Sequence, residues 1–290
     1  MFVAERRIWA RRFAPVRERR ASLLDIVATS RSKLAHTLSL LRSILILNNL
    51  IYLYTVVLGS LSLLSSLFDG SGRIQHWFAR TWSWLILKTA MCPVRVEGLD
   101  KIDTSKPYMY AANHLSALDI PVVYVHLPFQ FRIMAKEELF HYPFMGWHLR
   151  RSGQVSIDRS NALASMRSLN RAAETLKAGM PLVVYPEGGR SASGQVIPFL
   201  GGVFYAAIKA QSDVVPVALV GTFEALPMDT FHILPRPLRM LVGEPISTAG
   251  LVPRDMDALA LKVQKAVEDL YYSRADVPDP RRQPSEVVTP

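Results

Sequence analysis

The residues best suited to chemistry in this sequence are a histidine and an aspartate five positions apart in "NHLSALD", 113–119. No charged residue separates His114 from Asp119. An aspartate that accepts a hydrogen bond from one imidazole nitrogen fixes the ring tautomer and stabilises the imidazolium, so the other nitrogen is free to take a proton. The pair therefore suggests a general base, although the spacing alone favours Asp119 serving only as a helix cap and His114 as a polar turn residue.

The surrounding residues place this pair where a strand gives way to a helix. "PYMYAAN" (107–113) has the pattern of a buried strand, and "ALDIPVVYVH" (117–126) that of the following helix. Residues five apart on one helix lie about 140° apart, so the two side chains meet only if the histidine precedes the helix. Two registers allow this: Ser116 caps the helix with Asp119 three residues later, or Asp119 is the cap with Pro121 just inside.

Cations follow three further predicted strands, at Lys136, Arg159 and Arg190, the last in a Gly-rich turn with Glu187. Ligands of open α/β sheets bind at the carboxyl ends of strands, and arginine holds phosphate oxygens in a bidentate fork. We therefore expect these residues to converge on a phosphorylated substrate whose hydroxyl meets the histidine. The sequence contains no Gly-x-Ser-x-Gly elbow, P-loop or His/Cys metal cluster, so no cofactor is expected.

From about residue 94 short β-rich runs alternate with helical patterns, which predicts an α/β domain with a mixed, largely parallel sheet flanked by helices. The expected strands are 94–98, 108–113, 131–135, 154–157, 181–186, 214–221 and 238–243, and the expected helices after the first are 161–178, 202–210 and 255–272.

The segment before this domain is strongly apolar. Residues 43–68 contain no charged side chain, and about 20 apolar residues suffice to cross a bilayer. Tryptophans and cations follow at 77–88, and basic residues flank both ends, which favours a membrane-associated helical hairpin over a single span. A buried core helix is the alternative. The expected divisions are a basic arm (1–33), the hairpin (34–92), the α/β domain (93–275) and a disordered tail (276–290).

Composition agrees with a membrane surface as the partner. Half of the residues are hydrophobic and the formal net charge is +10, which suits anionic lipid better than nucleic acid. We expect the arginine-rich arm to bind such lipid. Cys92 is the only cysteine, so an intrachain disulfide is excluded.

Four blocks resemble, in order, those of the glycerolipid acyltransferase family, particularly the bacterial 1-acylglycerol-3-phosphate acyltransferases. They are "NHLSALD" (113–119), "VSIDRS" (155–160), "VVYPEGGRS" (183–191) and "VVPVALVG" (214–221). The resemblance implies transfer of a fatty acyl group from acyl-CoA or acyl-carrier protein to the free hydroxyl of lysophosphatidate, giving phosphatidate. It also implies a site on the cytoplasmic face of a bacterial inner membrane. Glycerol 3-phosphate, lyso-ornithine lipid and other lysophospholipids are alternative acceptors.

Carried over by position, the resemblance implies that His114 is the general base and Asp119 its partner. The implied substrate-binding residues are Asn113, Lys136, Arg159, Glu187, Gly188 and Arg190. Gly189 stands where the family usually has threonine. A non-catalytic membrane lipid-binding protein is the alternative from another class, and the intact His–Asp pair favours the enzyme.

Overall fold

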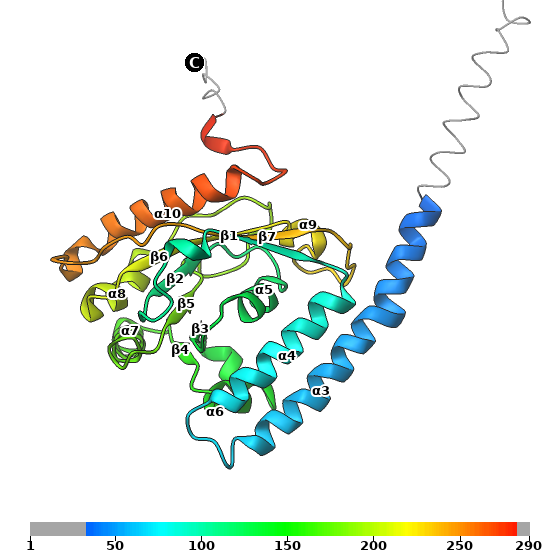
Figure 1. The fold of residues 1–290 in the computed structure, drawn as a ribbon, viewed down its shortest axis with the longest axis horizontal. Coiled ribbons are helices and arrows are strands. Elements are labelled where there is room, and N and C mark those ends of the chain that lie inside the picture. Colours follow the sequence, from blue (N-terminus) through cyan, green and yellow to red (C-terminus); the bar gives the residue numbers. More distant parts are fainter. Residues whose placement is uncertain (1–32, 283–290) are drawn as a thin grey trace, which may run out of the picture.

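The computed structural model describes residues 33–282, and the arginine-rich arm expected at 1–33 lies almost wholly outside them. A continuous helix runs from Lys33 to Ser65, in which a π-helical turn, η1 (Ser43–Leu47), precedes α3 (Asn48–Ser65). After a short turn, α4 (Arg73–Thr89) returns antiparallel and packs along α3 (Figure 1). Residues 33–89 thus form a helical hairpin, as the sequence suggested.

Seven strands form one sheet, in the order β1-β7-β6-β2-β5-β3-β4. All neighbours pair parallel except β6 and β7, which are antiparallel. The predicted mixed, largely parallel sheet is therefore confirmed. The strands are β1 (Val94–Glu97), β2 (Met109–Ala112), β3 (Arg132–Lys136), β4 (Val155–Ile157), β5 (Leu182–Val184), β6 (Val214–Val220) and β7 (Leu238–Val242).

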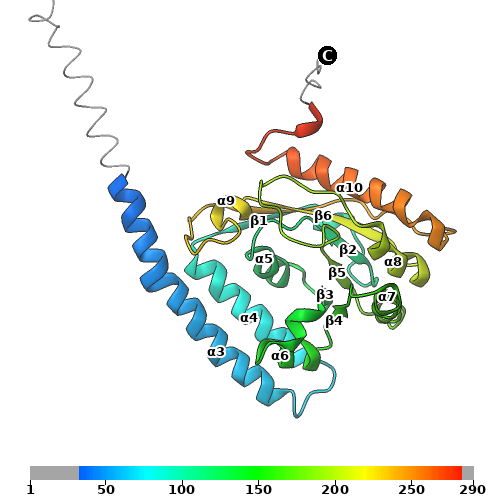
Figure 2. The same cartoon turned by 180° about the vertical axis from the view of Figure 1, so that it is seen from behind.

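Helices cover both faces of the sheet, which explains why its central strands are apolar on both sides (Figures 1 and 2). Helices α7 (Ala162–Lys177), α8 (Tyr205–Ala210) and α10 (Met256–Tyr272) pack on one face, where Met109 and Ala111 of β2 point. Helices α5 (Asp119–His126) and α4 cover the other face, towards Tyr110 and Ala112. The outer helix α3 lies beyond α4.

Three details differ from the sequence-based expectations. The short helices α6 (Met145–Arg151) and α9 (Thr222–Ala225) were not expected, because segments of seven and four residues carry too little periodicity to detect. The tail expected to be disordered from residue 276 is ordered as far as residue 282, where Arg281 pairs with Asp269 at 2.7 Å. The remainder of that tail lies outside the described residues.

Two arginine side chains form hydrogen bonds between the hairpin and the α/β domain. Arg80 of α4 donates to the carbonyl oxygens of Val125 and Leu127 at the end of α5, at 2.8 and 3.2 Å. Arg132 of β3 donates to the carbonyl of Ser71 in the hairpin turn at 2.8 Å. These bonds satisfy carbonyls that a helix end and a turn leave free. The hairpin therefore has a defined position against the domain.

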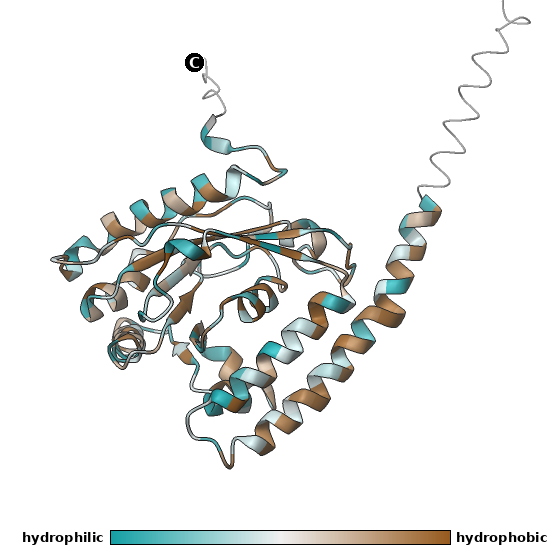
Figure 3. Cartoon of the chain, viewed as in Figure 1, coloured by the Kyte–Doolittle hydropathy of each residue, from teal (hydrophilic) through white to brown (hydrophobic). Residues whose placement is uncertain are grey.

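Most residues in the second half of the helix Lys33–Ser65 are hydrophobic (Figure 3), and many of its large apolar side chains are exposed. Among the described residues, one helix, Lys33–Ser65, is long and apolar enough to cross a membrane by length and composition. Very little of its apolar stretch is buried within the protein. The alternative of a buried core helix is therefore wrong for this segment.

Candidate active site

The histidine and aspartate of the first block are in direct contact. Nδ1 of His114 lies 2.8 Å from Oδ2 of Asp119. The same oxygen accepts hydrogen bonds from the backbone N–H groups of Leu115 and Ser116, at 2.7 and 2.8 Å. The aspartate is fully buried, whereas the histidine side chain is 19% exposed. With Nδ1 protonated as the donor to the carboxylate, Nε2 is left as the nitrogen that can accept a proton.

The helix register differs from both versions expected. Helix α5 starts at Asp119, and its N-cap is Leu118, which has helical backbone angles and makes no side-chain cap bond. The carboxylate turns back to the preceding turn instead, and the hydroxyl of Ser116 accepts from the N–H of Leu118 at 3.2 Å. The aspartate therefore organises the histidine-bearing turn, and Pro121 is the third helical residue.

An aromatic ring, which the sequence-based analysis missed, covers one face of the imidazole. The ring of Tyr185, immediately after β5, stacks on that of His114 with centroids 4.3 Å apart and planes 28° apart. Burial raises the pKa of Tyr185 well above its ordinary value, so the phenol is neutral. Its place next to the Gly-rich turn, at the carboxyl end of a central strand, is the signal that could have identified it.

The third block joins the histidine turn through its backbone. The N–H of Ser191 donates to the carbonyl of His114 at 2.9 Å. Glu187 is buried beside this turn. Burial raises its pKa to about 9, with the negative charge of Asp119 adding to the rise and the backbone N–H groups of His114 and Ile197 opposing it. The carboxyl is therefore protonated at neutral pH.

Arg159 reaches from the end of β4 to the Gly-rich turn after β5. A Cβ added to Gly188 would lie 2.6 Å from Nη1 of Arg159, so the guanidinium rests directly against this glycine. The backbone of Gly188 has φ +74°, which favours glycine. This contact brings two of the predicted binding residues together, and it depends on the missing side chain.

The remaining predicted cations lie at the same edge of the sheet. Nη2 of Arg190 is 4.0 Å from Oδ1 of Asp229, an acidic partner that the sequence did not indicate because it comes from a distant loop. Lys136 pairs in register with Ile157, two residues before Arg159, and its side chain is exposed. No ion pair joins Lys136 to another of the residues described here.

Asn113 has a different place from the one expected. It is fully buried, its Nδ2 donates to the carbonyl of Leu219 at 3.0 Å, and its Oδ1 accepts from the N–H of the same residue at 2.7 Å. The side chain thus extends the pairing of β2 with β6 by one step. Its geometry supports a structural role at the base of the histidine turn in place of contact with a substrate.

Glu187 provides a prediction about pH and stability. In the unfolded chain the carboxyl titrates near 4.5, and in the folded protein near 9. Its favourable contribution is therefore complete below about 4.5 and is lost as pH rises through about 9. We expect the melting temperature of the wild type to fall relative to that of Glu187→Gln between these limits. Exposed Glu138→Gln is the control, and parallel curves for wild type and Glu187→Gln would contradict the assignment.

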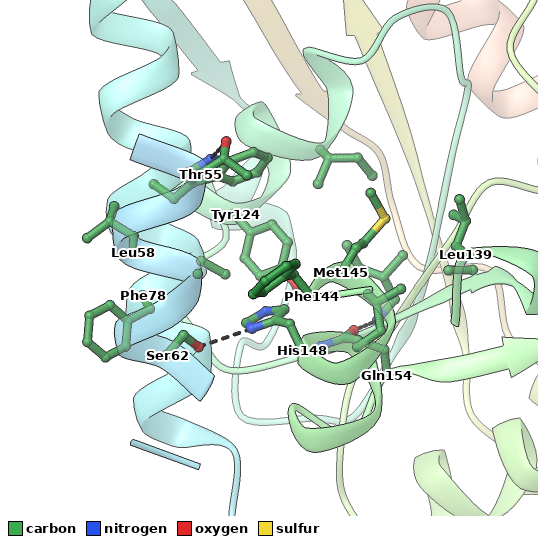
Figure 4. Close-up of a pocket in the computed structure, with 17 residues that line it drawn as sticks. Thr55, Leu58, Ser62, Phe78, Tyr124, Leu139, Phe144, Met145, His148 and Gln154 are labelled. Carbon is green, nitrogen blue, oxygen red and sulfur yellow. Dashed lines mark hydrogen bonds between the residues drawn. The ribbon is translucent and has the colours of Figure 1, made fainter. Parts of the chain in front are cut away.

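An apolar cavity of about 320 Å³ opens between the hairpin and the domain (Figure 4). Helices α3, α4, α5 and α6 and strand β3 line it. Ile120, which directly follows the site aspartate, is one of the lining residues. A polar contact also crosses the cavity wall, because Nδ1 of His148 in α6 lies 3.0 Å from Oγ of Ser62 in α3. The cavity therefore provides room for an apolar group and adjoins the first turn of α5, which follows the histidine turn.

Comparison with known proteins agrees with this geometry. A family model described as "Acyltransferase" matches residues 93–220. A 1-acyl-sn-glycerol-3-phosphate acyltransferase from Limnanthes alba is 29% identical over 180 residues, which are 62% of each chain. The enzyme of that name from Saccharomyces cerevisiae is 29% identical over 69% of this chain and 67% of its own. These matches support an acyltransferase domain at residues 93–220 and a similarity of the chain to glycerolipid acyltransferases.

A crystal structure of a family member has the same fold. The 1-acyl-sn-glycerophosphate (LPA) acyltransferase PlsC from Thermotoga maritima superposes with a TM-score of 0.63 at 26% identity. The match covers 82% of this chain and 97% of that one. The chain spans about 62% of the length of the Limnanthes relatives. The acyltransferase match at 93–220 contains all eight residues selected from the sequence.

Proposed function

We propose that the protein transfers a fatty acyl group from an acyl thioester, acyl-CoA or acyl-carrier protein, to the free hydroxyl of 1-acylglycerol 3-phosphate, forming phosphatidate. The observation that carries this proposal is the triply bonded Oδ2 of Asp119, which holds Nδ1 of His114 at 2.8 Å. Such an arrangement leaves Nε2 of His114 as a general base. The names of the relatives support the same reaction.

The reaction needs no acyl-enzyme intermediate. Nε2 of His114 takes the proton from the acceptor hydroxyl as its oxygen attacks the thioester carbonyl, and Asp119 stabilises the imidazolium that forms. Collapse of the tetrahedral intermediate breaks the carbon–sulfur bond. The imidazolium then returns its proton to the departing thiolate, so the histidine is restored and the products are an ester and a thiol.

The cations at the edge of the sheet and the apolar cavity bind different parts of the substrates. Arg159 and Arg190 bind the acceptor phosphate, since guanidinium groups match its oxygens and repay the cost of taking its charge out of water. Lys136 adds a third positive charge at the rim. The cavity beside Ile120 accommodates an acyl chain, because each buried CH₂ contributes about 0.8 kcal/mol.

The hairpin anchors the enzyme at the membrane that contains its insoluble acceptor and product. The exposed apolar side chains of the helix Lys33–Ser65 support this assignment. The cytoplasmic face of a bacterial inner membrane is the location we propose, because acyl-CoA and acyl-carrier protein are cytoplasmic thioesters.

The deciding experiment is an acceptor panel with one labelled acyl donor and products identified by mass. We expect lysophosphatidate to give phosphatidate at the highest kcat/KM, above glycerol 3-phosphate, lyso-ornithine lipid and other lysophospholipids. A different preferred acceptor would retain the chemistry and change the substrate. Thiol release that is independent of any acceptor would indicate a thioesterase, and binding of lipid without thiol release would indicate a non-catalytic protein.

Two adjacent glycines test the phosphate site. Gly188→Ala places a Cβ against the Arg159 guanidinium at a positive φ, so the arginine must move. Because a hydrogen bond to a charged group is worth about 1.5–3 kcal/mol, we expect KM for the acceptor to rise roughly 10- to 100-fold. Gly189→Ala is the matched control, since its Cβ would meet nothing within 4 Å. Equal kinetic effects of the two substitutions would contradict this role for Arg159.

A further inference from the structure

The loop between α9 and β7 connects the candidate site to the hairpin. Its first part, residues 226–234, is called the strap below. At one end, the carbonyl of Leu226 accepts from the hydroxyl of Ser116, inside the histidine turn, at 2.7 Å. Asp229 then lies 4.0 Å from Arg190. The strap therefore touches both the turn that holds the base and one of the phosphate-binding arginines.

The other end of the strap is hydrogen-bonded to the long apolar helix. Nδ2 of Asn48 donates to the carbonyl of Phe231 at 2.8 Å. The hydroxyl of Ser43 accepts from the N–H of Ile233 at 3.1 Å, and Arg42 donates to the carbonyl of Ile233 at 3.3 Å. These contacts explain why polar residues interrupt an otherwise apolar run: they bind a neighbouring backbone.

The backbone of the long apolar helix departs from α-helical geometry where the strap is bonded to it. The π-helical turn η1 spans Ser43–Leu47, and Nδ2 of Asn48 also donates to the carbonyl of Ser43 at 2.7 Å. π-helical turns are rare in proteins, and those that are found often lie at functional sites. The loop after α9 lies beside the hairpin in both views of the fold (Figures 1 and 2). The strap is thus fixed against the helix by a local change in helix geometry.

The strap leaves large apolar side chains uncovered next to the apolar face of the helix. Phe231 is 72% exposed and Leu234 is 40% exposed. On the helix, a few residues from the contact, Leu41 and Leu45 are 45% and 65% exposed. Exposed apolar side chains therefore occur both on the helix and on the strap that is hydrogen-bonded to it.

We propose that the strap is a second lipid-contacting element, whose Phe231 and Leu234 enter the same leaflet as the hairpin and hold the Arg190 side of the site against the lipid headgroups. This inference rests on the membrane-anchored acyltransferase proposed above. Lipid is the expected partner of this apolar surface because cations, including Lys33 and Arg73, lie on both sides of the uncharged hairpin segment 43–68. Such cations favour anionic headgroups. The helix also forms hydrogen bonds with backbone groups of Phe231 and Ile233 in the strap. Backbone polar groups that are buried in lipid need such partners within the protein.

Three single substitutions in the full-length protein test the proposal: Leu45→Cys on the helix, Phe231→Cys on the strap and Leu261→Cys on α10. These residues are 65%, 72% and 69% exposed, so all three cysteines can be labelled without disturbing the core. Cys92 is buried, and the unsubstituted protein measures its background labelling. Each variant carries an environment-sensitive fluorophore and is bound to anionic phospholipid vesicles whose acyl chains are brominated.

We expect quenching at positions 45 and 231 to be at least threefold stronger than at 261. Quenching at 45 without quenching at 231 would overturn the strap proposal and leave the anchored enzyme intact. Absence of quenching at both positions would overturn the anchor together with the strap. A label at 231 that is shielded from water yet unquenched would indicate a protein partner. Equal quenching at all three positions would show that no surface contacts lipid specifically. Each of these results rejects the proposal.

Discussion

Replacing His114 by alanine is expected to lower acyl transfer to lysophosphatidate by roughly 10²- to 10⁴-fold, the usual contribution of a general base. The acceptor hydroxyl would then have to lose its proton to water while it attacks the thioester. Arg159, Arg190 and the cavity are unchanged in this variant, so kcat is expected to fall much more than KM rises. Initial rates of acceptor-dependent thiol release from acyl-CoA measure the effect.

The matched control is His141→Ala, because the side chain of His141 is 71% exposed and lies on the short 3-10 helix after β3, away from the paired aspartate. We expect this variant to retain wild-type rates. A His114→Ala enzyme with near-normal kcat would mean that another group removes the proton, and the proposed mechanism would then be rejected.

Much of the fold was accessible from local patterns. All seven strands occur where short β-rich runs indicated them, and the helices at 162–177 and 256–272 match their apolar stripes. The strand order was not accessible, because it depends on which helices pack on which face of the sheet. The antiparallel pairing of β6 with β7 likewise comes from contacts between distant segments.

The candidate site also has some features that local sequence predicts and others that depend on tertiary packing. The His114–Asp119 pair could be predicted because both residues belong to one turn, whereas the exact position of the helix start could not. The carboxylate accepts from the N–H of Ser116, which is one of the two bonds of the predicted capping box. The hydroxyl of Ser116 accepts from Leu118 and not from Asp119, and the helix starts at Asp119. Asp229 reaches the site from a distant loop, so its sequence neighbours carry no signal. Tyr185 follows β5 beside the Gly-rich turn, and only its stacking on His114 depends on tertiary packing.

The second large effect concerns Asp119, where two substitutions should differ for a structural reason. Its Oδ2 accepts three hydrogen bonds, whereas Oδ1 has no partner among the described residues. In Asp119→Asn the amide oxygen must take the place of Oδ2, because an NH₂ group there would face three donors. The histidine then keeps its tautomer and loses only the negative charge that stabilises the imidazolium. Since a hydrogen bond to a charged group is worth about 1.5–3 kcal/mol, we expect kcat to fall roughly 10- to 100-fold.

Asp119→Ala removes the acceptor altogether, so the imidazole loses its orientation and tautomer together with the charge. We expect kcat to approach that of His114→Ala. The buried N–H groups of Leu115 and Ser116 would also lose their partner, at about 1–3 kcal/mol of unfolding free energy each. Chemical denaturation and kcat measured on the same preparations check both effects. Equal losses of activity in the alanine and asparagine variants, with equal stability, would contradict the triply bonded oxygen as the organiser of this site.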